Sequence, residues 1–328
     1  MSMNEVVEKI KSTFPKYEKL DHIIEQLNGK QFHSYGNAAA WVNDFSDEDK
    51  EIFDIEIATS LAAVCESGAE NAGDLICLIE VIYAVDHIND KEWAKRLVDK
   101  AKNLANERDL IVLAKLVADE DCLNDKVLAL EIVKGISPSD YYGGMDLAGF
   151  FQSIDDVDSA EKIFKESLVL ANDVISLLQI CEMYLNGKDY FQSRDFSFLT
   201  LNDDSLAREY IKKAIAVSEN SIDLQQIGTI VGREENKFGK DRGLNDKEWA
   251  KELLKKSYEM EKNDRENNCW RLQILAEILI DNTIINLDES NDALWINEIY
   301  KKALDLGDAA EKKDLKKSMK ERNVKLKK

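Results

Sequence analysis

The chain has 328 residues, of which only 2 are proline and 14 are glycine, and its 64 acidic and 44 basic residues give a formal net charge of −20. So few helix-breaking residues predict a mostly helical protein. A surface with this charge repels DNA and anionic membranes, so it disfavours those partners and favours a basic protein.

The sequence gives no sign of a membrane span, a secretion signal or a metal site. No window approaches the roughly 18 uninterrupted apolar residues of a transmembrane helix, and the N-terminal stretch MSMNEVVEKIKSTF is polar. Five cysteines lie at irregular spacings that match neither a disulfide framework nor a CxxC metal site. We therefore expect a soluble cytoplasmic protein with buried, reduced thiols and no metal or cofactor.

Residues 1–70 precede the repeated part of the chain. Their segment 46–68, SDEDKEIFDIEIATSLAAVCESG, has an amphipathic pattern with its own capping residues. An array of stacked helices needs an atypical end to shield its first apolar face, so we expect an N-terminal helical capping region here. His33 lies in this region, and a lone histidine is more typical of a hydrogen-bonded structural residue than of a catalyst.

From residue 89 onwards one motif recurs. The seven residues NDKEWAK occur at 89–95 and again at 245–251, and related copies begin at Leu123, Asp155, Asn202 and Asn291. Every copy has an Asp, at Asp90, Asp125, Asp156, Asp203, Asp246 and Asp292. Four residues later comes a small or aliphatic residue, at Ala94, Ala129, Ala160, Ala207, Ala250 and Ile296. Bulky apolar residues follow at three- and four-residue steps, which indicates one face of a helix.

The motif predicts a capped helix that packs closely on a neighbour. An Asn or Asp side chain at the start can accept hydrogen bonds from the first-turn amides. Asn89 with Glu92, and Asn245 with Glu248, have the spacing of a capping box. The small residue lets another helix approach, and a preceding tryptophan such as Trp93 then covers the contact.

A second apolar-periodic segment precedes each motif helix. These segments lie at 73–85, 108–118, 145–154, 172–185, 222–232 and 267–280, and most begin with Asp followed by an aliphatic residue. Neither helix of such a pair can bury its apolar stripe alone. The pattern therefore predicts helix pairs that stack on one another.

The motif resembles the second helix of a tetratricopeptide-type repeat, which reads D-x-x-x-A-x-x-x-[aliphatic or aromatic]-x-x-A. Asp90, Ala94, Val98 and Ala101 match it, as do Asp203, Ala207, Ile211 and Ala214. Successive motif Asp residues lie 35, 31, 47, 43 and 46 positions apart, unlike the regular repeat of that family of about 34 residues. The resemblance implies an all-α, right-handed α-solenoid of about six helix pairs. It would have a cap at 1–70, repeats at 71–310 and a basic C-terminal helix or tail at 311–328.

Two insertions lengthen the repeats, at 187–201 and 232–243, and both fall between the first and second helices of a pair. Insertions in solenoids project from one face, which is often the binding face. The first insertion carries residue types favoured at interfaces, and we predict a partner-binding site at Tyr190, Phe191, Arg194, Phe196 and Phe198. The same rings are equally consistent with filling a gap between helices.

No sequence motif indicates catalysis. Phosphate-binding loops, dinucleotide fingerprints, HExxH and GxSxG are all missing, and the carboxylate clusters at 47–49 and 119–121 are typical of solvated faces. We therefore expect a non-enzymatic protein-binding solenoid. A sharper hypothesis is an immunity- or antitoxin-type inhibitor that sterically occludes a basic toxin or effector. The alternative is a peptide-binding adaptor for assembly or regulation.

The C-terminal segment 311–328 departs from the acidic character of the chain, because it carries a net charge of +6. Cations near a helix C-terminus complement the helix dipole, so a solvated last helix explains this charge. A nucleic-acid-binding arm is the alternative that we disfavour.

Overall fold

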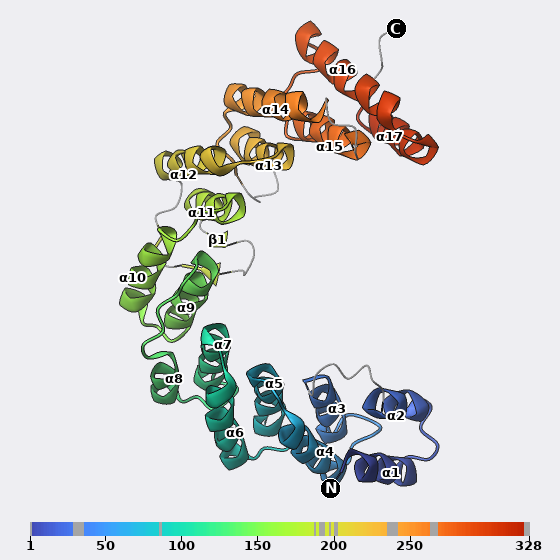
Figure 1. Cartoon of the computed structure of the whole chain (residues 1–328), viewed down its shortest axis with the longest axis vertical. Coiled ribbons are helices and arrows are strands. Elements are labelled where there is room, and N and C mark those ends of the chain that lie inside the picture. Colours follow the sequence, from blue (N-terminus) through green and yellow to red (C-terminus); the bar gives the residue numbers. More distant parts are fainter. Residues whose placement is uncertain are drawn as a thin grey trace. The chain divides into compact units, whose positions relative to one another are not determined.

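The computed structural model describes residues 2–28, 36–84, 87–186, 188–189, 194–196, 198–199, 203–234, 242–262 and 268–324. These residues form 17 helices and one hairpin of two-residue strands (Figure 1). The predicted helical class is confirmed. The chain separates into two compact units, 1–164 and 165–328. The predicted boundaries at residues 70 and 310 separate the repeats from a cap and a tail. The division into two compact units neither confirms nor contradicts them.

The N-terminal unit contains the helices α1 to α9. Their bounds are α1 Met3–Thr13, α2 Leu20–Asn28, α3 Gly36–Ser46, α4 Ile55–Gly68, α5 Ala72–Tyr83, α6 Lys91–Leu104, α7 Glu107–Ala118, α8 Lys126–Val133 and α9 Tyr141–Ser153. Helix α10, Val157–Leu168, crosses from this unit into the next. The predicted capping region 1–70 thus consists of α1 to α4 in its described part.

The C-terminal unit contains the hairpin and the helices α11 to α17. Their bounds are α11 Val174–Asn186, β1 Lys188–Asp189, β2 Arg194–Asp195, α12 Asp204–Val217, α13 Ser221–Gly232, α14 Lys247–Glu261, α15 Asn268–Asp281, α16 Ser290–Leu306 and α17 Ala309–Glu321. The two strands are antiparallel, with Lys188 opposite Asp195.

Consecutive helices pack as pairs at five of the six places that the sequence pattern predicts. The pairs are α5 with α6 and α7 with α8 in the N-terminal unit, and α11 with α12, α13 with α14 and α15 with α16 in the C-terminal unit. First helices also pack on first helices, so that α5 lies between α3 and α7 (Figure 1). Such an inner helix must be apolar on most of its surface.

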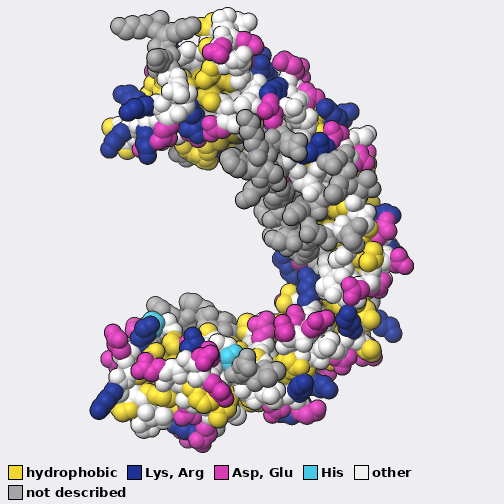
Figure 2. Space-filling view, turned by 180° about the vertical axis from the view of Figure 1, so that it is seen from behind, with side chains coloured by type: hydrophobic (Ala, Val, Ile, Leu, Met, Phe, Trp, Pro, Cys, Tyr) yellow, Lys and Arg dark blue, Asp and Glu magenta, His cyan; other side chains and the backbone are white. Residues whose placement is uncertain are grey.

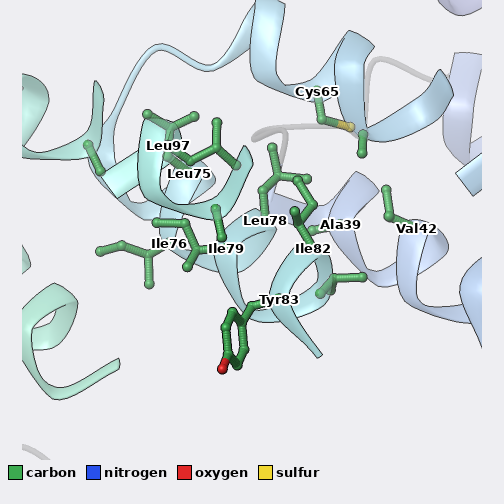
Figure 3. Close-up of a cluster of buried hydrophobic side chains, with 14 of the residues drawn as sticks. Ala39, Val42, Cys65, Leu75, Ile76, Leu78, Ile79, Ile82, Tyr83 and Leu97 are labelled. Atoms are coloured by element: carbon green, nitrogen blue, oxygen red, sulfur yellow. The ribbon is translucent and has the colours of Figure 1, made fainter. Parts of the chain in front are cut away.

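The core around α5 shows this arrangement (Figure 3). Leu75, Leu78, Ile79 and Ile82 of α5 are completely buried. Buried side chains from three neighbouring helices surround them, namely Ala39 and Val42 of α3, Cys65 of α4 and Leu97 of α6. Burial of apolar area on this scale is the main favourable term in folding, so the stack of first helices forms the spine of the unit.

Asp, and not Asn, caps the motif helices. The N-cap residues are Asp90, Asp125, Asp203 and Asp246, and each side chain accepts a hydrogen bond from an amide three residues later, at 2.8 to 3.2 Å. The predicted capping boxes of Asn89 with Glu92 and Asn245 with Glu248 are therefore wrong. Both asparagines precede the cap and adopt the left-handed conformation, with φ of 53° and 51°. Asn tolerates that conformation better than most residues.

The same Asp residues also close each hairpin. The backbone N–H of Asp90 donates to the carbonyl of Ile82 at 2.9 Å, and that of Asp246 donates to the carbonyl of Val231 at 2.8 Å. The left-handed Asn reverses the direction of the chain. The backbone N–H of the Asp then hydrogen-bonds the start of the second helix to the end of the first. The repeated NDKEWAK therefore specifies the turn of a helical hairpin.

The small motif residues allow close packing, as predicted. Ala94, Ala129, Ala160, Ala207, Ala250 and Ile296 are all completely buried. The last copy differs at its start, because α16 begins at Ser290 and its N-cap Glu289 makes no side-chain cap hydrogen bond. Asp292 lies inside the helix, where it accepts hydrogen bonds from the backbone of Asn286 at 2.8 Å and from Lys251 at 3.0 Å.

Candidate functional site: a protein-binding surface

The first insertion contains the sequence-predicted partner-binding residues. Tyr190 and Phe191 lie outside the described residues. Arg194 is in strand β2, Phe196 is 4% exposed, and Phe198 is partly buried with its ring centroid 5.3 Å from that of Phe196. Phe196 therefore fills space inside the unit. This burial is consistent with the alternative that rings of the insertion fill a gap between helices.

The second insertion ends against the start of the first. The backbone N–H of Arg242 donates to Oδ1 of Asn186 at 2.8 Å, and the Asn186 side-chain amide donates back to the Arg242 carbonyl at 3.1 Å. Asn186 is the last residue of α11, where the first insertion begins. The Arg242 guanidinium also binds the Asp204 carboxylate at the start of α12. Two insertions far apart in sequence thus adjoin at one edge of the C-terminal unit.

Backbone packing holds this junction tightly. A Cβ atom added to Gly243 would lie 2.1 Å from the carbonyl oxygen of Ile230 and 2.7 Å from that of Arg233. Leu244, the next residue, is buried, and its N–H donates to the Ile230 carbonyl at 3.0 Å. Only glycine fits at position 243, because any side chain would displace the end of α13.

A different surface appears in the N-terminal unit, where carboxylates gather at the ends of three first helices. These are 47–49 after α3, Glu80 near the end of α5 and 119–121 after α7, and together we call them the acidic edge. A hydrogen bond of 3.1 Å between Ser46 and His87 joins the ends of α3 and α5. Glu80 and Asp119 both act electrostatically on Cys122. Figure 2 shows Asp and Glu side chains gathered on this unit.

The acidic edge is not neutralised within the described chain. None of its seven carboxylates has a Lys, Arg or His partner within ion-pair distance among the described residues. The residues 48, 49, 80 and 119–121 are exposed. Loss of some hydration next to neighbouring groups raises the pKa of the Glu80 carboxyl, and a nearby cation would favour its charged form. This edge can therefore gain energy from an external cation.

Ion pairs in the C-terminal unit instead connect its own repeats. Arg208 of α12 donates to Asp246 at 2.7 Å, and Lys251 of α14 donates to Asp292 at 3.0 Å. Both cations lie five residues after a motif Asp, and both bind the motif Asp of the next repeat. The Arg208 guanidinium also lies 5.7 Å from the centroid of the Trp249 ring, so a cation–π contact accompanies the ion pair. The second NDKEWAK copy thus joins three successive helix pairs.

The basic C-terminal segment is a docked helix. Helix α17 is capped by Asp308 in a capping box, and its residues Leu315 and Met319 are buried. Just after the helix, Arg322 makes a bidentate pair with Asp281 at 2.6 and 2.9 Å. Lys313, Lys316, Lys317 and Lys320 are exposed on the other face. The described part of this segment therefore closes the end of the C-terminal unit.

The described residues show neither a three-ligand metal cluster nor a cysteine whose pKa is lowered. No group of three or more His, Cys, Asp or Glu among them is placed to hold a metal ion. Burial raises the pKa of the Cys65 thiol to about 12 and that of Cys122 to about 11, and a protonated thiol is a poor nucleophile. No described helix combines the length and apolar character that crossing a membrane requires.

Comparisons with protein-family models, curated proteins and solved structures give no match for this chain. The tetratricopeptide-like pattern therefore stays a resemblance of packing positions. The function has to be inferred from the surfaces of this chain.

Proposed function

We propose that this protein is a non-enzymatic helical-repeat protein whose acidic N-terminal unit binds a basic protein. In this proposal the helix pairs form a right-handed, tetratricopeptide-like solenoid. The observation that supports the binding function best is the acidic edge, whose carboxylates have no cationic partner among the described residues. Opposite charge accelerates association and selects the partner.

The acidic edge also suggests how binding would act on the partner. A row of carboxylates resembles nucleic-acid phosphates in charge, so it can cover the nucleic-acid-binding cleft of a basic toxin or effector. Inhibition would then be steric, as for an immunity- or antitoxin-type protein. Exposed ion pairs are screened by salt, so this contact would weaken as the ionic strength rises.

The test is capture of partners from the native lysate with the full-length protein at low and at moderate salt, followed by mass spectrometry. We expect one basic protein in stoichiometric amount, lost at the higher salt concentration. Addition of excess acidic-edge variant, with Glu80, Glu120 and both aspartates 119 and 121 changed to their amides, should not compete for that protein. Equal competition by this variant would contradict the proposal.

A peptide-binding adaptor is the second candidate function. A cavity between α7 and α9 in the N-terminal unit favours it, because cavities of its volume, about 430 Å³, suit single side chains or short peptide segments. Many captured proteins that share one short basic sequence, in place of one stoichiometric partner, would support the adaptor.

A further inference from the structure

The cavity lies between the first turns of α7 and α9. Its volume is about 430 Å³. The connection 134–140, which follows the short helix α8, forms one side of it. Helix α8 has 8 residues, whereas the second helices α6 and α12 have 14 each.

Apolar groups form much of the wall. Ile111 is 2% exposed, and Ile136 and Tyr142 are partly buried around the hollow together with Pro138. The Tyr142 ring meets the ring of Tyr141 edge to face at 5.2 Å. A flexible aliphatic chain can lie against such a wall, and a cation can lie over the aromatic ring.

The charges around the cavity favour a cationic occupant. Glu107 and Asp140 contribute two carboxylates to the lining. Arg108 contributes one cation, whose Nε atom is 3.6 Å from Asp146, so the lining holds two carboxylates against one guanidinium that already has an acidic neighbour. One first-turn amide of each helix already binds the protein's own cap: the Asp109 N–H donates to Asn106 at 3.0 Å, and the Gly143 N–H donates to Asp140 at 2.7 Å.

We propose that this cavity binds one arginine side chain of the basic partner. The aliphatic part of that side chain would lie against Ile111 and Ile136, and its guanidinium would bind between the Tyr142 ring and the two carboxylates. Arginine fits better than lysine, because a guanidinium is planar, stacks on aromatic rings and loses its hydration more easily. This inference rests on the proposed function, since it names the residue with which the partner is anchored.

Methyl NMR of the full-length protein tests the cavity without the natural partner. The probes are the blocked tripeptides Gly-Arg-Gly, Gly-Lys-Gly, Gly-Glu-Gly and Gly-citrulline-Gly, in which citrulline keeps the shape of arginine without its charge. We expect the arginine peptide to shift the Ile111 and Ile136 methyl resonances in a saturable way, and the lysine and citrulline peptides to bind more weakly. A response to the glutamate peptide in place of the arginine peptide would assign the cavity to an anion and overturn the proposal.

A variant of the cavity and a matched control show whether the arginine peptide binds at the two cavity carboxylates. The variant E107Q/D140N removes both carboxylates, and Asn at position 140 can still cap α9. It should bind the arginine peptide about tenfold more weakly, since two partly exposed ion pairs contribute about 1.4 kcal/mol together. The control E131Q/D158N removes two exposed charges elsewhere in the chain and should bind normally. Equal weakening in both variants would overturn the proposal.

The proposed function can fail separately from this inference. If the arginine peptide binds but neutralisation of the acidic edge leaves partner capture unchanged, the proposed function is wrong. If the partner binds through the acidic edge but no arginine peptide shifts the cavity methyls, only the inference about the cavity is wrong.

Discussion

The two units hold almost the same number of acidic residues but use them differently. The N-terminal unit has 33 acidic and 16 basic residues, a net charge of −17, whereas the C-terminal unit has 31 and 28, a net charge of −3. In the C-terminal unit, carboxylates such as Asp246 and Asp292 bind basic residues of the preceding repeat. In the N-terminal unit, the acidic edge faces solvent without such partners. Ion pairs connect neighbouring helices in both units, for example Lys115 of α7 with Asp146 of α9 in the N-terminal unit. The difference is that the N-terminal unit also carries an excess of carboxylates, those of the acidic edge, that are available to a partner.

The largest expected effect concerns the junction of the two insertions. Gly243→Ala should destabilise the C-terminal unit by about 3 kcal/mol, because the new methyl group would overlap the Ile230 carbonyl oxygen. Chemical denaturation followed by tryptophan fluorescence measures this, since Trp249, Trp270 and Trp295 all report on that unit. Gly73→Ala in α5 is the control in the N-terminal unit, where Trp41 and Trp93 report, and it should change stability little. Equal stability of both variants would show that the junction is not tightly packed.

The motif Asp should contribute more in the C-terminal unit than in the N-terminal unit. Asp90→Ala removes a helix cap and should cost about 1 kcal/mol. Asp246→Ala removes a cap and also the ion pair with Arg208, so it should cost about 1.5 kcal/mol. A double-mutant cycle of Asp246→Asn with Arg208→Gln isolates the pair, because Asn retains the cap. Zero coupling in this cycle would refute a stabilising role for the pair.

Salt should act on the two units in opposite directions. Added salt screens repulsion within the acidic N-terminal unit and should stabilise it by about 0.5 kcal/mol, while it weakens the ion pairs of the C-terminal unit. Hydrogen exchange at low and at high ionic strength resolves both units in one experiment. The same response in both units would remove the distinction drawn from their charges.

The smallest expected effect is the pH dependence of the Arg208–Asp246 pair. The hydrogen bond from Arg208 lowers the pKa of Asp246 below its ordinary value, which is about 3.9 in unfolded chains. Below that value the unfolded state binds the proton first, so the contribution of the pair is complete above about pH 4 and is lost as the pH falls further. The difference in unfolding free energy between the wild type and Arg208→Gln should therefore shrink on acidification. A difference that stays constant down to pH 2.5 would contradict this origin.

The helical pairs could be predicted from sequence because apolar spacing and buried small residues repeat with the helix period. The capping residue could not be fixed to one position, because Asn and Asp both suit a cap and only the backbone shows that Asn89 and Asn245 adopt the left-handed conformation. For Phe196 the sequence left two alternatives open, contact with a partner or burial in a gap between helices, and the residue is buried. Sequence alone does not tell whether a ring in an insertion faces solvent or fills a gap.

The acidic edge and the cavity could not be predicted from the sequence, for another reason. Residues 47–49, Glu80 and 119–121 form one edge only because α3, α5 and α7 pack side by side and end together. The cavity combines the first turns of α7 and α9 with the connection after the short helix α8. Such groupings depend on the packing of helices that lie far apart in the chain.

The most direct test compares two variants of equal charge for binding to the captured basic protein. The first changes Glu80, Asp119, Glu120 and Asp121 of the acidic edge to their amides, and the control changes four exposed acidic residues of the C-terminal unit, Glu219, Glu252, Asp288 and Asp305. Titration calorimetry at low salt should show about tenfold weaker binding for the first variant and little change for the control. Equal weakening in both variants would show that only the total charge matters, and unchanged binding in both would contradict a role for the acidic edge.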